Sequence, residues 1–407
     1  MYGSVEDVIR SSIQEQGQIT FAEFMEKALY GPGGGYYTKA SPIGTSGDYY
    51  TSPSTHPIFG GLISVQLFQM WQLMGRPKPF TIVEVGSGNG LLKRDLTQYL
   101  QYLPEDFSNN VEYVCIDKSE QSKIERNTHR KSISYSDIAE YQGLGIEGCV
   151  LSNELIDSFP VHRVQMKKGV LQELYVTLRE GVFVEKGGAL STQELNAHFD
   201  QPGIKLNEGH VFEVNLNACR WIKDVSRILK RGYIITVDYG GVAGEIYSES
   251  KSQGTLTCFY RHVQTNNPYL HIGNQDITSQ VNYTTLTKCG LGQGFVNKGY
   301  LSQREFLTNL GLPYFLRLLQ AMDIDSHTKL ANRFSMLDLV SAEGFGDFKV
   351  LIQGKNVSNA ALWCRQLGFE EMPVLKELPI PMLTESHMPL LEGKYPHVRL
   401  ELPDTWM

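Results

Sequence analysis

The chain has 407 residues, and its 37 Lys and Arg against 44 Asp and Glu give a formal net charge of -7 at pH 7. This acidic balance excludes the broad basic surface that strong non-specific binding to nucleic acid or acidic membranes requires. The length predicts two to three domains. With 41% hydrophobic and 20% charged residues, the composition is that of an ordinary globular protein.

The sequence also carries signals about compartment. No run of 18 apolar residues occurs, so we expect no membrane insertion. The first ten residues include Glu6 and Asp7 and lack the apolar segment of a signal peptide. We therefore expect neither a secretory signal nor a transit peptide there. Six scattered cysteines without a C-x-x-C pair are expected to be reduced core thiols. We therefore expect a cytoplasmic protein, or a mitochondrial matrix protein only if a transit peptide is missing from this sequence.

Residues 1–75 are predicted to form helices and a ligand-covering loop. Ser4–Gln16 has helical spacing, and Thr20 with Glu23 can cap a second helix. Ile58–Met74 is so apolar that a helix there must be buried. Between them, a long Gly-, Tyr- and Pro-rich segment ends at Pro53. Such a loop either covers a ligand or simply packs on its own tyrosines.

From residue 76 onward, strand and helix signals alternate. Strands are expected at Phe80–Val85, Val111–Ile116, Gly148–Leu151 and Tyr233–Val237, and helices at Leu91–Leu103 and Ala218–Leu229. This order predicts an α/β fold with parallel βαβ units and helices on both faces of the sheet. Ligands of such folds bind at the carboxyl ends of the strands. We assign residues 76–160 and 211–240 to this Rossmann-like sheet.

The remaining segments are interpreted as additions to that fold. Val161–Lys186 alternates apolar and polar residues, so residues 161–210 are predicted to be an antiparallel β insertion. Gly240–Asn274 is loop-like, and residues 241–355 are assigned to a substrate-side insertion and the end of the sheet domain. Residues 356–407 form a C-terminal extension for which the sequence predicts no role.

The strongest motif is a strand that runs into Glu84-Val85-Gly86-Ser87-Gly88-Asn89-Gly90. Glycines allow a ligand to approach the backbone, and the following helix offers unpaired N–H groups. The dinucleotide fingerprint G-x-G-x-x-G needs glycine where this chain has Leu91. Glu84 also suits a ligand with an amino group better than a pyrophosphate. The motif therefore favours S-adenosylmethionine over NAD.

Two further carboxylates are candidates for cofactor binding. Asp117 ends the second strand and could accept hydrogen bonds from ribose hydroxyls, which both S-adenosylmethionine and NAD require. Asp137, next to Ser136, could contact the adenine end or cap a helix. The glycine motif, Glu84, Asp117 and the order of the strands together predict a class I S-adenosylmethionine-dependent methyltransferase.

Polar residues also follow two other strands. Asn153, Glu154 and Asp157 come after one strand and Asp238 after another, so all should meet at the same sheet edge. Capping and turn formation would explain Asp157, but explain Asn153 and Glu154 together less easily.

Six segments resemble the MidA-type family, which includes the mitochondrial complex I assembly factor 7 protein-arginine methyltransferase. They follow one another in order within residues 1–355: Phe24–Tyr37, Gly47–Pro53, Glu84–Gly90, Asn153–Asp157, Val237–Gly240 and Asp276–Asn282. The resemblance implies a class I methyltransferase fold with extra N-terminal and inserted segments. In mitochondrial members it implies methylation of an arginine in a respiratory complex I subunit.

The chain departs from the family pattern at three places. The family often has Gly-Pro-Gly-Arg-Gly where Gly86–Gly90 reads Gly-Ser-Gly-Asn-Gly, and glutamates where Ser54 and Gly61 stand. The retained glycines imply cofactor binding, whereas the missing acids leave the substrate open.

We expect Glu154 to clamp the acceptor, assisted by Asp157 or Asp238, with Asn153 holding acceptor or cofactor. The segment from Gly47 through Thr51, Ser52 and Pro53 is expected to close over the cofactor. Arg261-His262 and Asp276–Thr278 are expected to line the opposite wall, with His262 a weaker candidate base. A protein acceptor, such as a respiratory dehydrogenase subunit, and a homodimer fit this interpretation.

Three alternatives stay open: a small-molecule methyltransferase, a non-catalytic S-adenosylmethionine-binding assembly factor, and an NAD-dependent oxidoreductase, which Leu91 disfavours. No metal site is expected. Asp323 to His327 could ligate an ion but fits a polar turn and helix cap better.

Overall fold

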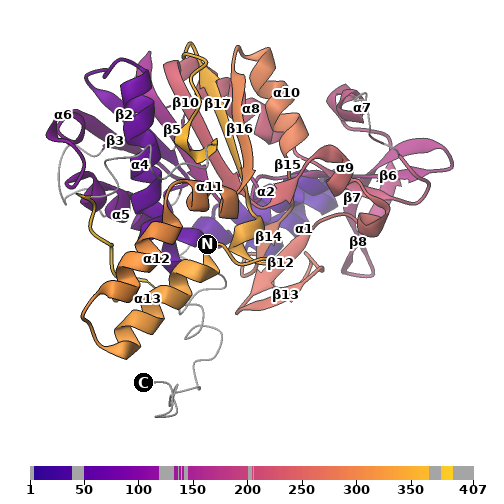
Figure 1. Cartoon of the computed structure of the whole chain (residues 1–407). Coiled ribbons are helices and arrows are strands. Elements are labelled where there is room, and N and C mark those ends of the chain that lie inside the picture. The colour runs from indigo at the N-terminus through magenta and orange to yellow at the C-terminus, as the bar shows by residue number, and fades with distance from the viewer. Residues whose placement is uncertain are drawn as a thin grey trace.

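The computed structural model describes residues 4–38, 50–118, 133–135, 137–138, 140–141, 145–199, 204, 206–365 and 377–387. A seven-stranded sheet with helices on both faces forms the main body (Figure 1). A second, antiparallel sheet extends to one side of it, and α12 and α13 lie at the bottom of the view.

The N-terminal helices begin where local capping predicts. They are α1 (Val5–Gln16), α2 (Phe21–Tyr30), α3 (Ser52–Thr55) and α4 (Ile58–Leu73). Ser4 and Asp7 cap α1 reciprocally, and Thr20 Oγ1 accepts from the Glu23 N–H at 3.1 Å. α4 is buried from Ile58 to Trp71, as its apolar sequence predicts.

The central sheet has the order β16-β17-β10-β5-β2-β3-β4. Its strands are β2 (Phe80–Val85), β3 (Val111–Ile116), β4 (Ile133–Tyr135), β5 (Ile146–Asn153), β10 (Leu229–Asp238), β16 (Val296–Ser302) and β17 (Lys349–Lys355). The pairs from β10 to β4 are parallel, whereas β17 runs antiparallel to both β10 and β16. A doubly wound dinucleotide sheet has the order 3-2-1-4-5-6, so this sheet differs by one reversed strand inserted near its edge.

Helices cover the two faces of this sheet with separate apolar cores. On one face lie α4, α5 (Leu91–Leu100), α11 (Gln303–Asn309), α12 (Leu312–Ala321) and α13 (Ser326–Asp338). On the other face lie α8 (Leu216–Ile228) and α10 (Tyr283–Gly292). The short helix α6 (Glu105–Ser108) connects α5 to β3.

A disulfide joins α8 to α10. It pairs Cys219 with Cys289, whereas Cys115, Cys149, Cys258 and Cys364 are free and buried. The expectation that all six cysteines are thiols is therefore wrong for this pair, because the fold brings together two residues that lie 70 positions apart in the sequence.

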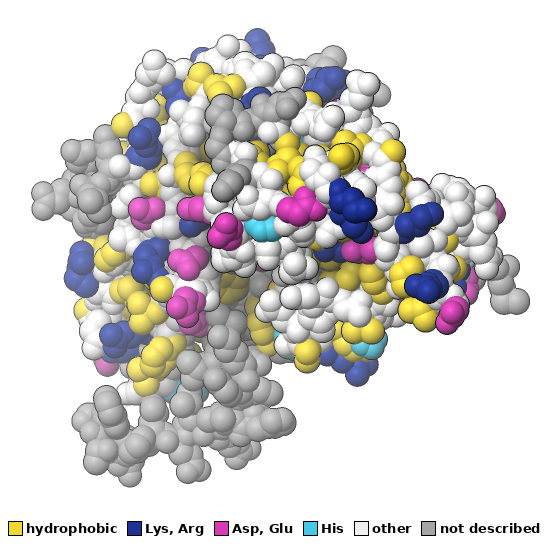
Figure 2. All heavy atoms as spheres, turned by 90° about the vertical axis from the view of Figure 1, so that its right-hand side faces the viewer, with side chains coloured by type: hydrophobic (Ala, Val, Ile, Leu, Met, Phe, Trp, Pro, Cys, Tyr) yellow, Lys and Arg dark blue, Asp and Glu magenta, His cyan; other side chains and the backbone are white. Residues whose placement is uncertain are grey.

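The second sheet contains β1 (Ile19–Thr20), β6 (His162–Lys167), β7 (Val170–Arg179), β8 (Val182–Gly188) and β9 (Val211–Val214), all paired antiparallel. The helix α7 (Gln193–Phe199) follows β8. The predicted boundary at residue 210 is wrong, because β9 pairs with β6 in the register Val164↔Phe212 and not with the central sheet. Figure 2 views this side, where acidic and basic side chains are interspersed.

The segment after β10, expected to be loop-like, contains short strands. β12 (Thr257–Tyr260) lies between β13 (Val263–Thr265) and β14 (Asp276–Thr278), and β11 (Gly240–Gly241) pairs with β15 (Val281–Asn282). α9 (Ala243–Ile246) and the 3-10 turns η1 (Tyr36–Thr38), η3 (Glu249–Lys251), η4 (Phe345–Asp347) and η5 (Trp363–Arg365) complete the described elements. No helix among the described residues is long and apolar enough to cross a bilayer.

Candidate active site

The glycine loop between β2 and α5 is held in a conformation that favours glycine. Gly86, Gly88 and Gly90 have φ values of 77°, 52° and 73°. A Cβ added to Gly86 would lie 2.8 Å from Leu155 Cδ1, so a side chain there would have to displace Leu155. The Gly88 N–H donates to Asp117 Oδ2 at 2.7 Å, which joins the loop to the end of β3.

The residues of this loop fit a methyl donor with an amino acid moiety and a ribose. Glu84 is buried beneath the loop, where its carboxylate accepts a hydrogen bond from Tyr113 Oη at 2.7 Å. Burial raises the pKa of Glu84 to about 7. Two carboxylates, Glu84 and Asp117, beside a glycine-rich backbone suit cationic and hydroxyl groups and repel a pyrophosphate. Asp137 is exposed, and its predicted contact with adenine stays a prediction, as does the role of Ser136 outside the described residues.

Sequence analysis missed Tyr113 as the partner of Glu84. Tyr113 faces Ile82 in the β2–β3 register, which places its hydroxyl near Glu84 one pleat further along the same face. Because this contact depends on the pairing of two strands, no local sequence pattern predicts it.

The turn after β5 carries the predicted acceptor clamp. Glu154 has the positive φ of 48°, and its N–H donates to the Val237 carbonyl at 2.8 Å. Its Oε1 accepts from Asn153 Nδ2 at 2.9 Å and from the Ser52 N–H at 3.1 Å. Burial raises the pKa of Glu154 to about 8. A non-glycine residue in this strained conformation is typical of functional sites.

The two proposed helpers of Glu154 occupy different environments. Asp238 Oδ2 accepts from the N–H groups of Ile156 (2.9 Å) and Asp157 (3.2 Å), and Oδ1 accepts from the Tyr239 N–H (2.9 Å). These bonds make Asp238 an anchor of the turn. Asp157 is 7% exposed, and its Oδ1 has no hydrogen-bond partner. Of the two, Asp157 is therefore better placed to contact an acceptor.

The opposite wall brings Asp276 and two tyrosines toward this turn. Burial, and then the negative charges of Asp238, Asp276 and Glu154, raise the pKa of Asp157 well above its usual range. Asp276 Oδ1 accepts from Tyr37 Oη at 2.8 Å. The Tyr37 ring stacks on Tyr30 with centroids 5.4 Å apart.

The turn between β12 and β13 forms another part of this wall. Arg261 and His262 both have positive φ values, 47° and 62°. The His262 ring stacks on Tyr50, with centroids 4.8 Å apart. The structure thus places His262 against Tyr50, two residues before α3, and its role as a base stays a prediction.

The expected covering segment is described only from Tyr50 onward, since Gly47 to Tyr49 lie outside the described residues. Thr51, Ser52 and Pro53 are buried at the start of α3. Ser52 Oγ donates to Gln303 Oε1 at 3.1 Å. Ser54, which replaces a family glutamate, has its hydroxyl bonded to Thr51 within the same turn. The contact of Ser52 with Glu154 was not predicted.

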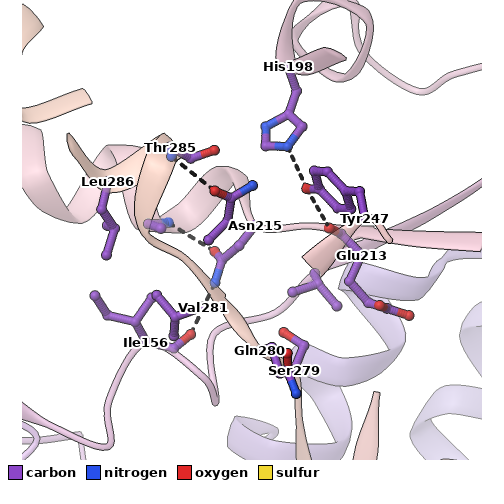
Figure 3. Close-up of a pocket in the computed structure, with 13 residues that line it drawn as sticks. Ile156, His198, Glu213, Asn215, Tyr247, Ser279, Gln280, Val281, Thr285 and Leu286 are labelled. Atoms are coloured by element: carbon purple, nitrogen blue, oxygen red, sulfur yellow. Dashed lines mark hydrogen bonds between the residues drawn. The ribbon is translucent and has the colours of Figure 1, made fainter. Parts of the chain in front are cut away.

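A small pocket lined by both polar and apolar side chains lies behind the acidic turn (Figure 3). Asn215 Nδ2 donates to the Ile156 carbonyl at 3.0 Å, and the Ser279 N–H donates to the Asp157 carbonyl at 2.9 Å. His198 Nε2 contacts Tyr247 Oη at 2.7 Å, and burial lowers the pKa of His198 to about 4. The contacts of Asn215 and Ser279 hold the backbone of the turn at Ile156 and Asp157.

Among the described residues, no group of His, Cys, Asp and Glu has a metal-binding arrangement. Asp325 caps α13 by accepting from the Thr328 N–H at 2.8 Å, as the interpretation of Asp323 to His327 as a turn and cap predicts.

The fold and the glycine loop define an S-adenosylmethionine-dependent methyltransferase of class I. Residues 62–301, more than half of the chain, match the family model "Putative S-adenosyl-L-methionine-dependent methyltransferase". The chain belongs to this family. The predicted family, fold class and cofactor are thereby confirmed.

Relatives and a solved structure agree with this assignment. Protein arginine methyltransferase NDUFAF7 homolog, mitochondrial, from Drosophila melanogaster is 26% identical over 339 residues, 76% of this chain and 75% of the relative. Human protein arginine methyltransferase NDUFAF7, mitochondrial, is 26% identical over 338 residues, 75% and 73% of the two chains. A COG1565 superfamily member from Burkholderia thailandensis bound to S-adenosyl-homocysteine is 28% identical with a TM-score of 0.79, covering 88% of this chain and 94% of that chain. The names of the first two do not support the expected cytoplasmic location.

Proposed function

We propose that this methyltransferase modifies an arginine side chain of a protein. The observation that carries the proposal is a group of three carboxylates whose charges interact: half-buried Glu154 and buried Asp157 after β5, and buried Asp276 on the opposite wall. A guanidinium group is a cation that carboxylates can bind through two parallel hydrogen bonds. Asp157, whose Oδ1 is unpartnered, would gain such a bond.

The chemistry of arginine explains why buried acids are needed. A free guanidinium keeps its proton to a pKa near 12.5 or above, so its nitrogen offers no lone pair until that proton leaves. Glu154, with a pKa raised to about 8, is a stronger base than an exposed glutamate and can accept this proton. Asn153 and Ser52 hold one oxygen of Glu154 and so fix the direction of the other.

Bound S-adenosylmethionine would supply a methyl group already activated by a positive sulfur. The loop Gly86–Gly90 and Asp117 would hold it, with Glu84 and Tyr113 below. The residues of this chain then align the acceptor and exclude water, which are the main contributions a protein makes to such a displacement.

The relatives support this proposal, because their names describe them as mitochondrial protein arginine methyltransferases. With the family resemblance, they favour a respiratory dehydrogenase subunit as the acceptor, and an enzyme that meets it in the compartment where that complex is assembled.

The test is transfer of an isotopically labelled methyl group from S-adenosylmethionine into a lysate of the host, followed by mass spectrometry. The proposal expects labelled methylarginine in a protein with the native enzyme, and about 100-fold less or lower still with Glu154→Gln. Label found only in small molecules would make the chain a small-molecule methyltransferase. Cofactor binding without label in any acceptor would make it a non-catalytic assembly factor.

A further inference from the structure

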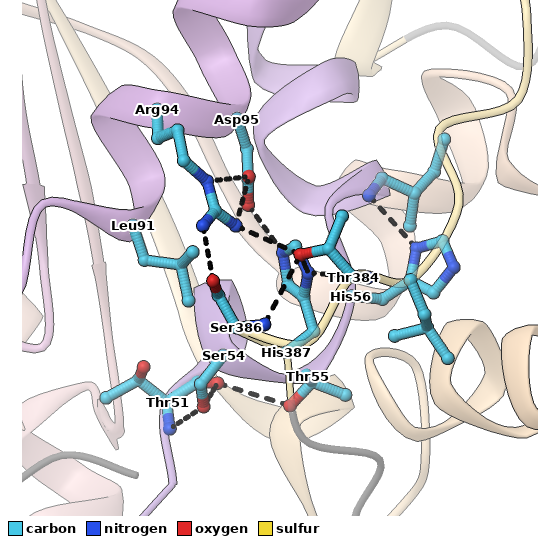
Figure 4. A network of polar contacts seen from close by, with 12 residues as sticks. Thr51, Ser54, Thr55, His56, Leu91, Arg94, Asp95, Thr384, Ser386 and His387 are labelled. Atoms are coloured by element: carbon cyan, nitrogen blue, oxygen red, sulfur yellow. Dashed lines mark hydrogen bonds and ion pairs between the residues drawn. The ribbon is translucent and has the colours of Figure 1, made fainter. Parts of the chain in front are cut away.

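The segment Glu377–His387, here named the C-terminal strap, binds the helices that carry both halves of the site. Sequence analysis assigned no role to it. Leu378 is buried in the same core as α4 and α5, and Tyr99 Oη of α5 donates to the Pro379 carbonyl at 2.9 Å. The end of the strap forms the polar network in Figure 4.

The first part of this network joins the strap to α5. His387 Nε2 lies 2.8 Å from Asp95 Oδ2, and both side chains are almost completely buried. The Thr384 N–H donates to His387 Nδ1 at 3.3 Å, so the ring hydrogen that Asp95 receives is on Nε2. Arg94 Nη1 donates to Ser386 Oγ at 2.6 Å (Figure 4).

The second part joins the strap to the end of α3. Asn332 Oδ1 on α13 accepts from the Leu383 N–H at 2.9 Å and lies 3.1 Å from His56 Nε2. His56 follows α3 directly, and its Nδ1 accepts from the Ile58 N–H at 3.0 Å. The strap thus reaches α3 through one asparagine.

α3 and α5 are the two helices whose first residues form the site. α5 begins at Leu91, directly after Gly90 of the glycine loop, and Asp95 lies one turn further along it. α3 begins with Ser52, whose N–H holds Glu154. On the other side of Asp95, a Cβ at Gly60 of α4 would lie only 3.1 Å from Asp95 Cβ. Asp95 is therefore enclosed between α4 and the strap.

We propose that His387 is a positioning residue, which holds α5 through Asp95 and thereby sets the glycine loop for the methyl donor. A buried carboxylate oxygen without a hydrogen-bond partner is unfavourable, so the loss of its partner favours movement of the residue toward a new one. In this chain such a movement shifts the helix on which the loop ends.

The test measures the affinity for S-adenosylhomocysteine by calorimetry, so its outcome does not depend on the identity of the acceptor. His387→Ala is expected to weaken binding about tenfold, because a buried partner is lost. His387→Gln, whose amide N–H can replace the ring donor, is expected to restore most of the affinity. Glu385→Ala, an exposed change in the same strap, is expected to leave affinity unchanged.

A role of His387 in overall stability alone would give a different result in the binding measurements. Asp95→Ala removes the contact with His387 and also those of Arg94 with Asp95 Oδ1. The double variant is expected to lose no more affinity than Asp95→Ala alone, because His387 acts through Asp95. Lower melting temperature with unchanged affinity in His387→Ala, or losses that multiply, would overturn the proposal. If His387→Ala does not fold, His387→Met keeps most of the side-chain volume but removes the donor to Asp95, and unchanged affinity in that variant refutes the proposal equally.

Discussion

Ser52 and Glu154, separated by 102 positions in the sequence, are joined by a hydrogen bond of 3.1 Å from the backbone N–H of the first to Oε1 of the second. The segment expected to cover the cofactor is thus attached to Glu154, the proposed base. Movement of this segment would change the orientation of Glu154 as well as access to the site.

We expect Glu154→Gln to lower methyl transfer about 100-fold or more, because general-base catalysis is lost while the side chain keeps its shape. Affinity for S-adenosylhomocysteine should stay within about threefold, since the glycine loop is untouched. Glu112→Gln, at the amino end of β3 and far from the strand ends of the site, is the matched control. Near-normal turnover of Glu154→Gln would remove the residue from the mechanism.

The pH dependence of kcat/KM should reflect Glu154. Burial first, opposed by the bonds from Ser52 and Asn153 and reinforced by Asp238 and Asp276, raises its pKa to about 8. A base must be deprotonated, so kcat/KM is expected to rise as pH increases through about 8 and to fall below it. This limb should vanish from the residual activity of Glu154→Gln, and its persistence there would assign it to another group.

Gly86→Ala tests the fit of the glycine loop. The added Cβ would meet Leu155 Cδ1 at 2.8 Å with φ at 77°, a conformation that costs a non-glycine residue about 1–2 kcal/mol. We expect affinity for S-adenosylhomocysteine to fall about tenfold, which corresponds to about 1.4 kcal/mol. Gly292→Ala in α10, where an added Cβ meets nothing within 4 Å, should leave binding unchanged.

His56 should make the protein sensitive to acid. Burial lowers its pKa to about 3, so the folded state excludes a proton that the unfolded chain binds below its ordinary value of 6.5. The stability from neutral His56 is complete above pH 6.5 and is lost as pH falls toward 3. When the pH is lowered from 7 to 5, the free energy of unfolding of the native protein should fall by about 2 kcal/mol more than that of His56→Gln. Equal losses in denaturant unfolding would show that His56 is protonated in the fold.

Features set by neighbouring residues could be predicted from the sequence. Ser4 and Thr20 mark helix starts because a capping side chain bonds to amides three residues away. The glycine loop follows from its own composition, and so does the placement of Asn153 and Glu154 at the end of a strand.

Features that depend on distant pairing could not be predicted. The short apolar run of β9 fits either sheet, and only its pairing with β6 decides between them. Likewise, Asp157 and Asp238 look equivalent in the sequence, whereas the backbone amides around Asp238 distinguish their surroundings. The disulfide of Cys219 and Cys289 depends on how α8 packs against α10.

The position of β17 has a consequence for biosynthesis. This strand, Lys349–Lys355, is the last described strand to leave the ribosome, yet it lies between β10 and β16 and pairs with both. Until it is made, β10 and β16 each have an open edge and their apolar faces remain incompletely covered. The nascent chain therefore depends on protection from aggregation until Lys355 has emerged, and any premature stop before that point leaves an unclosed sheet.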